Sequence, residues 1–349
     1  MRIALDAMGG DYAPKNTIEG AVLALKEYPF LEKLFLVGDA VVIGSELKRL
    51  DCKDSRVEIF HASEVVSMKE SAAKAVRHKK DASICRAVDL VKNGSAHAVV
   101  SAGHTGAAVA AAVLKLRTLK GIERPAIVCL LPTESKVFVL IDGGANPDST
   151  PENLVQFAIM GSVFSQHVLG YKSPSVALMS IGEEDIKGND VVKQAAELLR
   201  ASDLNFHGNV EGTDIYKGTT DVIVCDGFVG NVALKTSEGL ALMLADYLRE
   251  EFTRNPLRKL LAVFALPALN SFKRRVDPRR YNGATLIGLK GVVIKSHGSA
   301  DALAFRYALK KAYAEVTHGV LERIAQRLAV TPAAASETPA AAAAGSGDA

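Results

Sequence analysis

The stretch that decides the fold is Val99-Val100-Ser101-Ala102-Gly103-His104-Thr105-Gly106-Ala107. An apolar run ends here in small and hydroxyl residues, and an alanine-rich segment of helical character continues to Leu116. This pattern predicts a strand, a tight glycine turn and the first turn of a helix. Glycine lets the backbone approach a ligand closely and a helix N-terminus offers free N–H groups, so an anion fits there. A plain strand-to-helix turn, with small residues for packing, explains the stretch equally well.

The same arrangement recurs along the chain, where short apolar runs end in polar, glycine-rich turns. These turns occupy residues 6–11, 38–39, 142–146, 182–189, 226–231 and 297–298. Segments of helical character lie between the runs, and this alternation favours a three-layer α/β/α sandwich around a largely parallel sheet. Residues 132–135 join two adjacent runs closely enough for a hairpin, so part of the sheet is expected to be antiparallel.

Ligands of open α/β sheets bind at the carboxyl ends of the strands. We therefore expect one crevice to be faced by the strand-end residues Asp6, His104, Asp142, Lys187, Asn231 and His297. Neither GxGxxG nor the Walker phosphate loop occurs, which disfavours a standard nucleotide-binding fold. The carboxylates could be metal ligands, but carboxylates that follow strands as often fix turns by hydrogen bonding to the backbone.

Length and composition are typical of a soluble, intracellular protein. The chain has 349 residues, and we expect residues 1–330 to form a single α/β/α catalytic domain. A net charge of +3 is too small to indicate nucleic-acid binding, and the four separated cysteines indicate reduced thiols. Asp6 comes too early for a signal peptide, and no apolar run approaches the roughly 20 residues of a membrane span. Residues 331–349 are alanine-rich and are expected to be disordered.

A basic and apolar segment at about 250–280 differs from the rest of the chain. Its apolar run is broken by Pro267 and surrounded by Arg254, Arg258, Lys259, Lys273, Arg274, Arg275, Arg279 and Arg280. This composition suits two short helices that meet at an apolar tip, with cations placed to meet anionic lipid headgroups. The membrane-contacting residues would be Leu260, Leu261, Phe264 and Leu266. A dimer contact, a core helix pair or an acidic protein partner would also explain the segment.

Taken together, the strand-end turns resemble the sequence blocks of a known family. The opening Asp6-Ala7-Met8-Gly9-Gly10-Asp11 is similar to that of the bacterial phosphate acyltransferases of phospholipid synthesis. The family's other blocks follow in its order: 101–107, 142–146, 181–184, 187–188, 208–212, 226–231 and 295–298. The resemblance runs from residue 1 to about 325 and is highly specific as a set. One departure is visible, because the family usually has asparagine where this chain has His104.

The resemblance implies a fold, a reaction and partners. The fold is similar to those of phosphate acetyltransferases and isocitrate-type dehydrogenases. The reaction converts acyl-ACP (acylated acyl carrier protein) and inorganic phosphate to acyl phosphate and free ACP, which feeds glycerophospholipid synthesis. The family forms homodimers and works at the inner face of the cytoplasmic membrane, where a glycerol-3-phosphate acyltransferase acts downstream. No metal, other cofactor or nucleic acid is implied.

This reaction requires cations and N–H donors, because phosphate and a developing oxyanion must be held together. We expect Lys187 and Asn231 to contact phosphate or the oxyanion, and His297 with Lys295 to orient phosphate or protonate the leaving sulfur. The expected phosphate-binding residues are Ser101, Gly103, His104, Thr105, Gly106 and Lys295. The expected substrate-cleft residues are Asp6, Gly9, Gly10, Asp142, Asn146 and Asp226.

The three expected catalytic residues also have structural interpretations. Lys187 could pair with Glu183 or Glu184 in a solvated loop, Asn231 could be an ordinary first-turn residue, and His297 could cap nearby backbone. These alternatives remain open on sequence alone.

Other chemistries and functions are also open. Cys225 could form a covalent intermediate, although a buried strand thiol is usually inert. An isocitrate-type dehydrogenase would share the fold, but the chain lacks an arginine-rich carboxylate clamp. A non-catalytic membrane scaffold would rest on residues 254–280 alone.

Overall fold

A computed structural model describes residues 1–67 and 69–330, except for the side chains of residues 273–276, 278 and 330. The expected disordered tail, residues 331–349, lies outside the described residues. One eleven-stranded sheet has the order β3-β2-β1-β4-β11-β10-β5-β6-β9-β7-β8. Its strands are β1 (Arg2–Asp6), β2 (Lys33–Gly38), β3 (Val57–His61), β4 (Ala98–Ser101), β5 (Ala126–Pro132), β6 (Val137–Ile141), β7 (Val176–Met179), β8 (Phe206–Val210), β9 (Val222–Val224), β10 (Ala284–Ile287) and β11 (Val292–Lys295).

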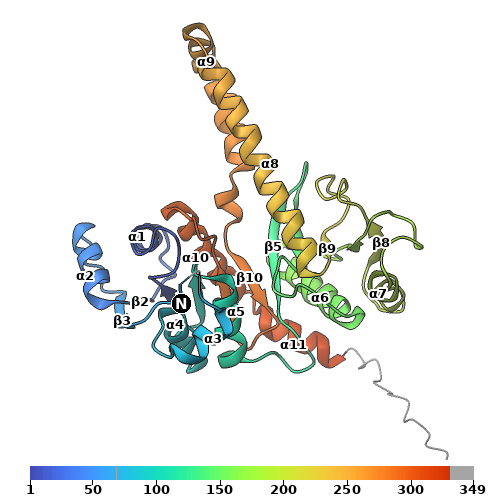
Figure 1. Ribbon diagram of the computed structural model, residues 1–349, viewed down its shortest axis with the longest axis horizontal. Helices are drawn as coiled ribbons and strands as arrows, with labels where there is room; N and C mark the ends of the chain where they lie inside the picture. The colour runs from blue at the N-terminus through green and yellow to red at the C-terminus, as the bar shows by residue number, and fades with distance from the viewer. Residues whose placement is uncertain (68, 331–349) are drawn as a thin grey trace, which may run out of the picture.

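Helices cover both faces of this sheet (Figure 1). They are α1 (Lys15–Glu27), α2 (Ala40–Arg49), α3 (Ala72–His78), α4 (Ser83–Lys92), α5 (Thr105–Leu116), α6 (Pro151–Phe164), α7 (Asp190–Arg200), α8 (Gly227–Thr253), α9 (Pro256–Val276), α10 (Ala302–Thr317) and α11 (Val320–Val330), with a π turn η1 (Ser165–Leu169) and a 3-10 turn η2 (Pro278–Tyr281). The arrangement confirms the predicted α/β/α sandwich, and the antiparallel pairing of β5 with β6 confirms the predicted hairpin.

The two halves of the sheet run in opposite directions. In the first half, β3, β2, β1, β4 and β11 are parallel to one another. In the second half, β6, β9, β7 and β8 are parallel. Successive antiparallel pairings of β11 with β10, β10 with β5, and β5 with β6 reverse the direction between them.

The carboxyl ends of both halves nevertheless meet along one line. Pairing partners connect in a single row across the sheet, through Leu5, Val100, Ile294, Thr285, Val128, Ile141, Val224 and Leu178. Apart from Thr285 and Val128 of the connecting strands, each of these residues is the last or next-to-last of its strand. The strands of the first half therefore reach this row of residues from one side of it, and the strands of the second half reach it from the other side. The strand-end loops consequently form two groups rather than a single edge.

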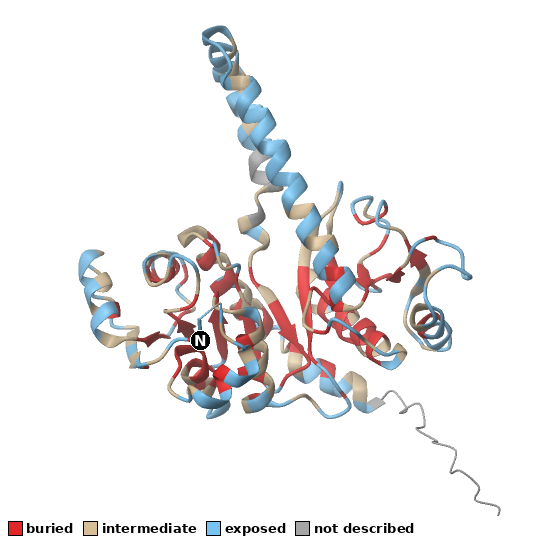
Figure 2. Cartoon of the chain, in the orientation of Figure 1, coloured by how far each residue is buried: buried red, intermediate tan, exposed pale blue. Residues whose placement is uncertain are grey.

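The hydrophobic core follows the alternation of the strands, as expected for a sheet that is covered on both faces. Ile3 and Leu5 of β1 pack with residues of α1 and α10, whereas Ala4 packs with residues of α4 and α5. In the second half, Ile141 of β6 packs with residues of α6, α7 and α11. Leu140 faces the other way, in the cluster against which the first turns of α8 pack. Figure 2 shows this buried sheet in red.

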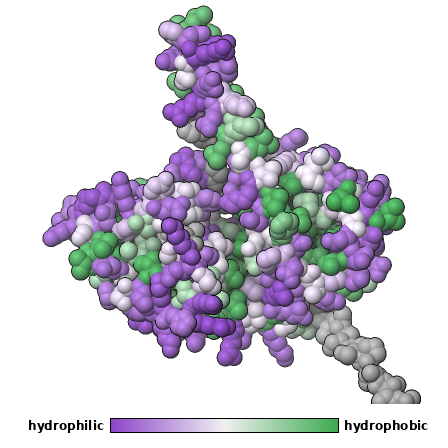
Figure 3. All heavy atoms as spheres, viewed as in Figure 1, coloured by the Kyte–Doolittle hydropathy of each residue, from purple (hydrophilic) through white to green (hydrophobic). Residues whose placement is uncertain are grey.

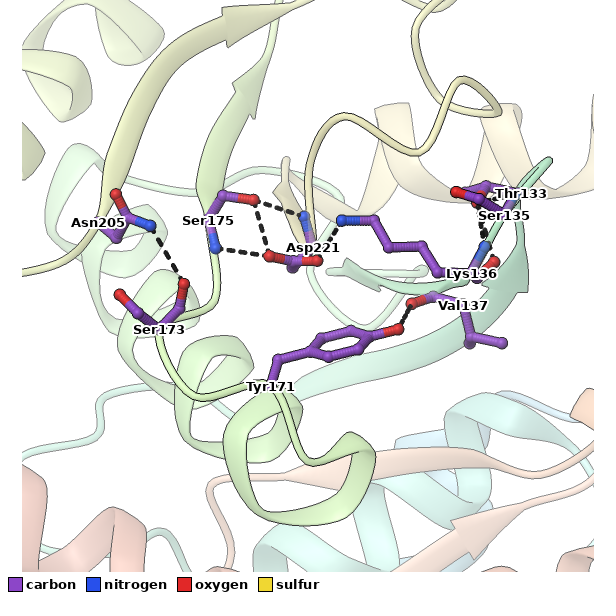
Figure 4. Close-up of polar contacts among 9 residues, drawn as sticks. All are labelled: Thr133, Ser135, Lys136, Val137, Tyr171, Ser173, Ser175, Asn205 and Asp221. Atoms are coloured by element: carbon purple, nitrogen blue, oxygen red, sulfur yellow. Dashed lines mark hydrogen bonds and ion pairs between the residues drawn. The ribbon is translucent and has the colours of Figure 1, made fainter.

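A polar cluster fastens the amino ends of the second-half strands together (Figure 4). The Asp221 carboxylate, just before β9, pairs with Lys136 and accepts hydrogen bonds from Ser175 N at 2.8 Å and Ser175 Oγ at 2.9 Å. Tyr171 Oη donates to the carbonyl of Val137 at 2.8 Å. The cluster lies at the opposite ends of these strands from the loops described below, so we interpret it as structural.

Helices α8 and α9 form a long hairpin, here called the arm, which projects from the body (Figure 1) and is largely exposed (Figure 2). The expectation of two short helices with an apolar tip within residues 254–280 is wrong. Helix α9 runs through Pro267, and the turn of the hairpin lies at Arg254 and Asn255. Asn255 Oδ1 accepts from Arg258 N at 2.9 Å and Pro256 is the first helical residue, so α9 begins before the apolar run.

Apolar side chains lie along the arm, its outer end included, and they are mixed with polar ones (Figure 3). On α9, a stripe with helical spacing is 54% to 77% exposed and comprises Leu257, Leu260, Leu261 and Phe264. Leu266 is also exposed, but it comes two residues after Phe264 and therefore lies on a different face. A second stripe on α8 comprises Leu240, Leu244, Tyr247 and Leu248. None of the helices in the described part of the chain is long and apolar enough to cross a membrane.

Candidate functional site

Three strand-end loops of the first half interlock, following β1, β4 and β11. Gly9 lies so close to the β4 loop that an added Cβ would be 2.7 Å from Gly103 N and 2.6 Å from Asp6 Oδ2. Gly10 has a φ of +119°, a conformation that L residues rarely adopt. Asp11 N donates to the carbonyl of Gly298 at 2.8 Å. The glycine pair is therefore required for the close approach of these loops.

Asp6 lies buried behind the interlocked loops. Its Oδ2 accepts from Ser101 Oγ at 2.7 Å, and Ser101 Oγ accepts in turn from Gly103 N at 3.1 Å. Asp6 Oδ1 is buried and has no hydrogen-bond partner among the described residues. Burial raises the pKa of Asp6, against hydrogen bonds from Ser83 and Ser101. Asp6 and Ser101 thus position the glycine turn, and a small cavity between them is lined by Gly103, His104 and Val66, among others.

His104 caps helix α5, so its side chain has a structural role that the sequence did not show. Its Nδ1 accepts from Ala107 N at 3.3 Å, which makes this nitrogen an acceptor and leaves the proton on Nε2. Thr105 is exposed at the first helical position, and Gly106 packs against α3. N–H groups in the first turn of α5 lack intrahelical partners, so this end of the helix can accept an anion.

Replacing His104 with asparagine is expected to keep the free energy of unfolding within about 0.5 kcal/mol of the original, because asparagine is among the best N-caps. Replacing it with leucine should lower that free energy by about 1 kcal/mol, since the cap is lost. Urea unfolding of both variants measures the difference. Equal losses in the two variants would show that the imidazole contributes more than a cap.

Asp142 organises the loop that follows β6. Its carboxylate accepts from the backbone N–H groups of Ile127 and Asn146, each at 2.8 Å, and from those of Gly144 and Ala145. Asn146 Nδ2 donates to the same carboxylate at 2.8 Å, and the backbone carbonyl of Asn146 accepts from Gly227 N at 2.7 Å. These contacts agree with the interpretation that a carboxylate after a strand fixes its turn by hydrogen bonding to the backbone. The loop in turn holds the first residue of α8.

The first turns of α8 connect the two groups of strand-end loops. Asp226 caps the helix by accepting from Val229 N at 2.8 Å. The Asn231 side chain lies against Gly144, whose added Cβ would be 3.4 Å from Asn231 Oδ1. Four residues later, and thus on the same face, Lys235 Nζ lies 3.1 Å from Nε2 of His297, in the loop after β11. Helix α8 therefore spans from the second-half loops to the first-half loops.

Lys235 and its neighbour Glu238 are the site residues that sequence reasoning missed. Lys235 Nζ lies 2.7 Å from Glu238 Oε2, which is itself 3.8 Å from His297 Nε2. Their spacing after Asn231 was visible in the sequence as i, i+4 and i+7, but only packing shows which residue the helix carries to His297. The signal that could have found them is the helix start at Asp226-Gly227.

Two lysines, Lys295 and Lys235, supply positive charge near the end of β11. Lys295 is the pairing partner of Ser101 in β4, so it lies beside the glycine turn. Burial lowers the pKa of Lys295 to about 8, and the Asp6 carboxylate opposes that shift. Burial, and next the Lys235 ammonium, lower the pKa of His297, so its imidazole is mostly neutral at neutral pH. Lys295 thus brings positive charge beside the glycine turn, and Lys235 adds positive charge within electrostatic reach of Lys295.

Lys187 lies apart from this cluster. It is exposed on the loop after β7, where its side chain lies over Gly182. Among the described residues, it forms no ion pair with Glu183 or Glu184, and no contact joins it to Asn231. Its catalytic role therefore stays a prediction.

The buried thiols are poor nucleophiles. Burial raises the pKa of Cys225 well above its ordinary value, and the carboxylates of Asp142 and Asp226 add to that shift. Burial likewise raises the pKa of Cys129 to about 12. Within the described ranges, no group of three or more His, Cys, Asp or Glu side chains could hold a metal ion.

A family model and two similar proteins of known name agree on the family of this chain. A sequence model of the family described as fatty acid synthesis protein matches residues 1–323. The chain is 53% identical over 329 residues to the phosphate acyltransferase of Paraburkholderia phytofirmans, covering 94% of this chain and 89% of that protein. The phosphate acyltransferase of Paraburkholderia xenovorans is 52% identical with the same coverage.

Solved structures share the fold at low sequence identity. A phosphotransacetylase from Streptococcus pyogenes superimposes with a TM-score of 0.60 at 19% identity, covering 91% of this chain and 94% of that one. A branched-chain phosphotransacylase from Enterococcus faecalis gives 0.56 at 16% identity, with 90% and 99% covered. These two likenesses establish a common architecture.

Proposed function

The chain belongs to the phosphate acyltransferase family, and on this premise we propose that it transfers an acyl group from acyl-ACP to inorganic phosphate. It is an enzyme, an acyltransferase of lipid synthesis. The observation that carries the finer proposal is the position of Lys295 beside Ser101 and the glycine turn that opens α5, with Lys235 within electrostatic reach of Lys295. Positive charge and N–H donors at one place suit a phosphate dianion.

In the proposed reaction, a phosphate oxygen attacks the thioester carbonyl carbon. The new O–C bond forms as the C–S bond breaks, and the carrier leaves as a thiolate that takes up a proton. Lys235, Lys295 and the glycine turn hold phosphate, while the Asn231 amide donates to the developing oxyanion. His297, between Lys235 and Ser299, orients phosphate or passes the proton to the sulfur.

Release of carrier thiol from long-chain acyl-ACP tests the proposal. We expect release only when phosphate is present, with acyl phosphate formed in equal amount. Steady-state rates should give intersecting double-reciprocal lines and survive Cys225→Ala, as direct attack requires. Absence of release with any long-chain acyl-ACP would contradict the proposal. A nicotinamide absorbance change in the same mixture would favour the dehydrogenase alternative.

We further propose that the protein is a homodimer at the inner face of the cytoplasmic membrane, where it hands acyl phosphate to a glycerol-3-phosphate acyltransferase. Exposed apolar stripes on both helices of the arm support this, because a monomer rarely leaves such an area uncovered. The α8 stripe would pack against a second copy, and the α9 stripe would contact lipid. Sedimentation equilibrium should give twice the mass of one chain.

The paired change Leu260→Glu and Phe264→Glu is expected to abolish sedimentation with anionic liposomes and to leave activity in solution within about twofold. Two buried carboxylates oppose insertion of the stripe into lipid. Leu266→Glu with Asn270→Glu, on a different face of α9, is the matched control and should still bind. Binding of the first variant to liposomes would show that the α9 stripe does not contact the membrane.

A further inference from the structure

The basic segment at residues 69–80 has no part in the site described above. Its helix α3 turns Ala75 and Val76 into the core and leaves Lys74 and Arg77, three residues apart, on the outside. Lys69 and Lys80 flank the helix and are also exposed. We call these four side chains the basic face of α3.

The cations of the basic face have no acidic partners among the described residues. None of the four forms an ion pair within the described part of the chain. The neighbouring acids already have partners: Glu70 pairs with the inward-turned Lys79 at 2.8 Å, and Asp81 Oδ2 accepts from Ser63 N and Oγ, each at 2.7 Å. Uncompensated positive charge therefore faces solvent here.

The basic face adjoins the proposed phosphate site. Helix α3 packs against the start of α5, where an added Cβ on Gly106 would be 3.0 Å from Ala72 Cβ. Val65 and Val66, in the segment that leads into α3, line the same small cavity as Asp6 and His104. Val65 is 41% exposed, so an apolar side chain that lines this cavity also reaches the surface.

The arm is the competing basic surface, but charges at its turn and just beyond the end of α9 are internally paired. Arg254 and Arg258 both pair with Glu251. Arg279 pairs with Asp277 at 2.7 Å and with Asp301 at 3.1 Å. An acidic protein would have to break these pairs on the arm, whereas the basic face of α3 offers free cations.

We infer that the basic face of α3 docks an acidic protein, and, resting on the proposed function, that this protein is the acyl carrier that brings the thioester. Charge complementarity selects an acidic partner. The position beside α5 lets the carrier's flexible acyl-bearing prosthetic group pass Val65 to reach the site. Docking through surface charge should accelerate association and weaken with salt.

The test uses a double variant of the basic face, Lys74→Glu plus Arg77→Glu, here called the α3 variant. The control is a double variant with an equal charge change, Lys172→Glu plus Lys193→Glu, on the exposed surface of the other half. Binding of the three proteins to fluorescent palmitoyl-ACP is measured by anisotropy at low and high salt. We expect the α3 variant to bind about tenfold more weakly at low salt, to lose most of its salt dependence, and the control to bind as the original does.

A second measurement separates docking from chemistry. Phosphate-dependent cleavage of a small acyl-pantetheine thioester, which lacks the protein part, should be equal in all three proteins. Unchanged carrier binding by the α3 variant would overturn the inference, as would an equal loss with the control. A loss of binding to anionic vesicles alone would assign the face to lipid and also overturn it. If the original binds the carrier through α3 but releases no thiol, docking stands and the proposed function fails.

Discussion

Replacement of Lys295 with methionine is expected to lower kcat/KM for phosphate by about 100-fold, because a preorganised cation is removed beside the glycine turn. Lys295 is the β11 neighbour of Ser101 and lies within electrostatic reach of Asp6, Asp11 and Lys235. Methionine is similar in length and apolar, so the partly buried site should stay packed. Initial rates over a range of phosphate concentrations measure the effect.

The pH dependence of phosphate binding follows from the pKa of Lys295, which burial lowers to about 8. Below that pH the side chain is an ammonium and binds phosphate; above it the charge is lost, so the phosphate KM should rise. Between about 8 and the ordinary lysine value, the folded chain binds fewer protons than the unfolded chain, so this group makes stability increase with pH.

Lys295→Arg is the control for charge, because a guanidinium stays protonated across this range. Its phosphate KM should lose the rise above about pH 8 that the original shows. A methionine variant with an unchanged kcat/KM, or an arginine variant with the original alkaline rise, would contradict a phosphate-binding role for Lys295.

Replacement of Asp142 with alanine is expected to lower the free energy of unfolding by about 3 kcal/mol or more, since several loop N–H groups lose their acceptor at a buried position. The same change should reduce activity, because the loop that Asp142 fixes holds Gly227 and contacts Asn231. Urea unfolding measures the first effect and thiol release the second.

Asp142→Asn keeps the shape but offers only one carbonyl oxygen, so its loss of stability should lie between those of the original and the alanine variant. A stable alanine variant would mean that water replaces the carboxylate in the loop. An unstable variant with full activity per folded molecule would mean that the loop does not position Asn231.

Much of the architecture could be predicted from the sequence because its signals are local. Apolar runs that end in glycine turns predicted most of the strands, and the 132–135 turn predicted a hairpin. Family resemblance across the strand-end blocks predicted the fold, and the relatives confirm the family. The sequence predicted a glycine turn at residues 6–11, and the structure adds that Gly9 and Gly10 are required for the close approach of loops there.

Other features depend on contacts between residues far apart in the chain. The reversal between the two halves rests on β10, a strand of four residues that pairs with β11 and β5 and carries little periodic signal of its own. Lys235 lies near His297 only because α8 crosses between the halves. The imidazole of His104 turned out to cap its own helix, and Asn255 placed the turn of the arm before its apolar run.

Sequence by itself determined most of the strands, where their glycine turns lie and to which family the chain belongs, because propensity, capping and turn chemistry act over a few residues. Tertiary structure decided the direction of each half, the element that joins their loops, and which cations the protein leaves free. Strand direction and side-chain partnership depend on pairing between distant segments, and packing selects that pairing as a whole.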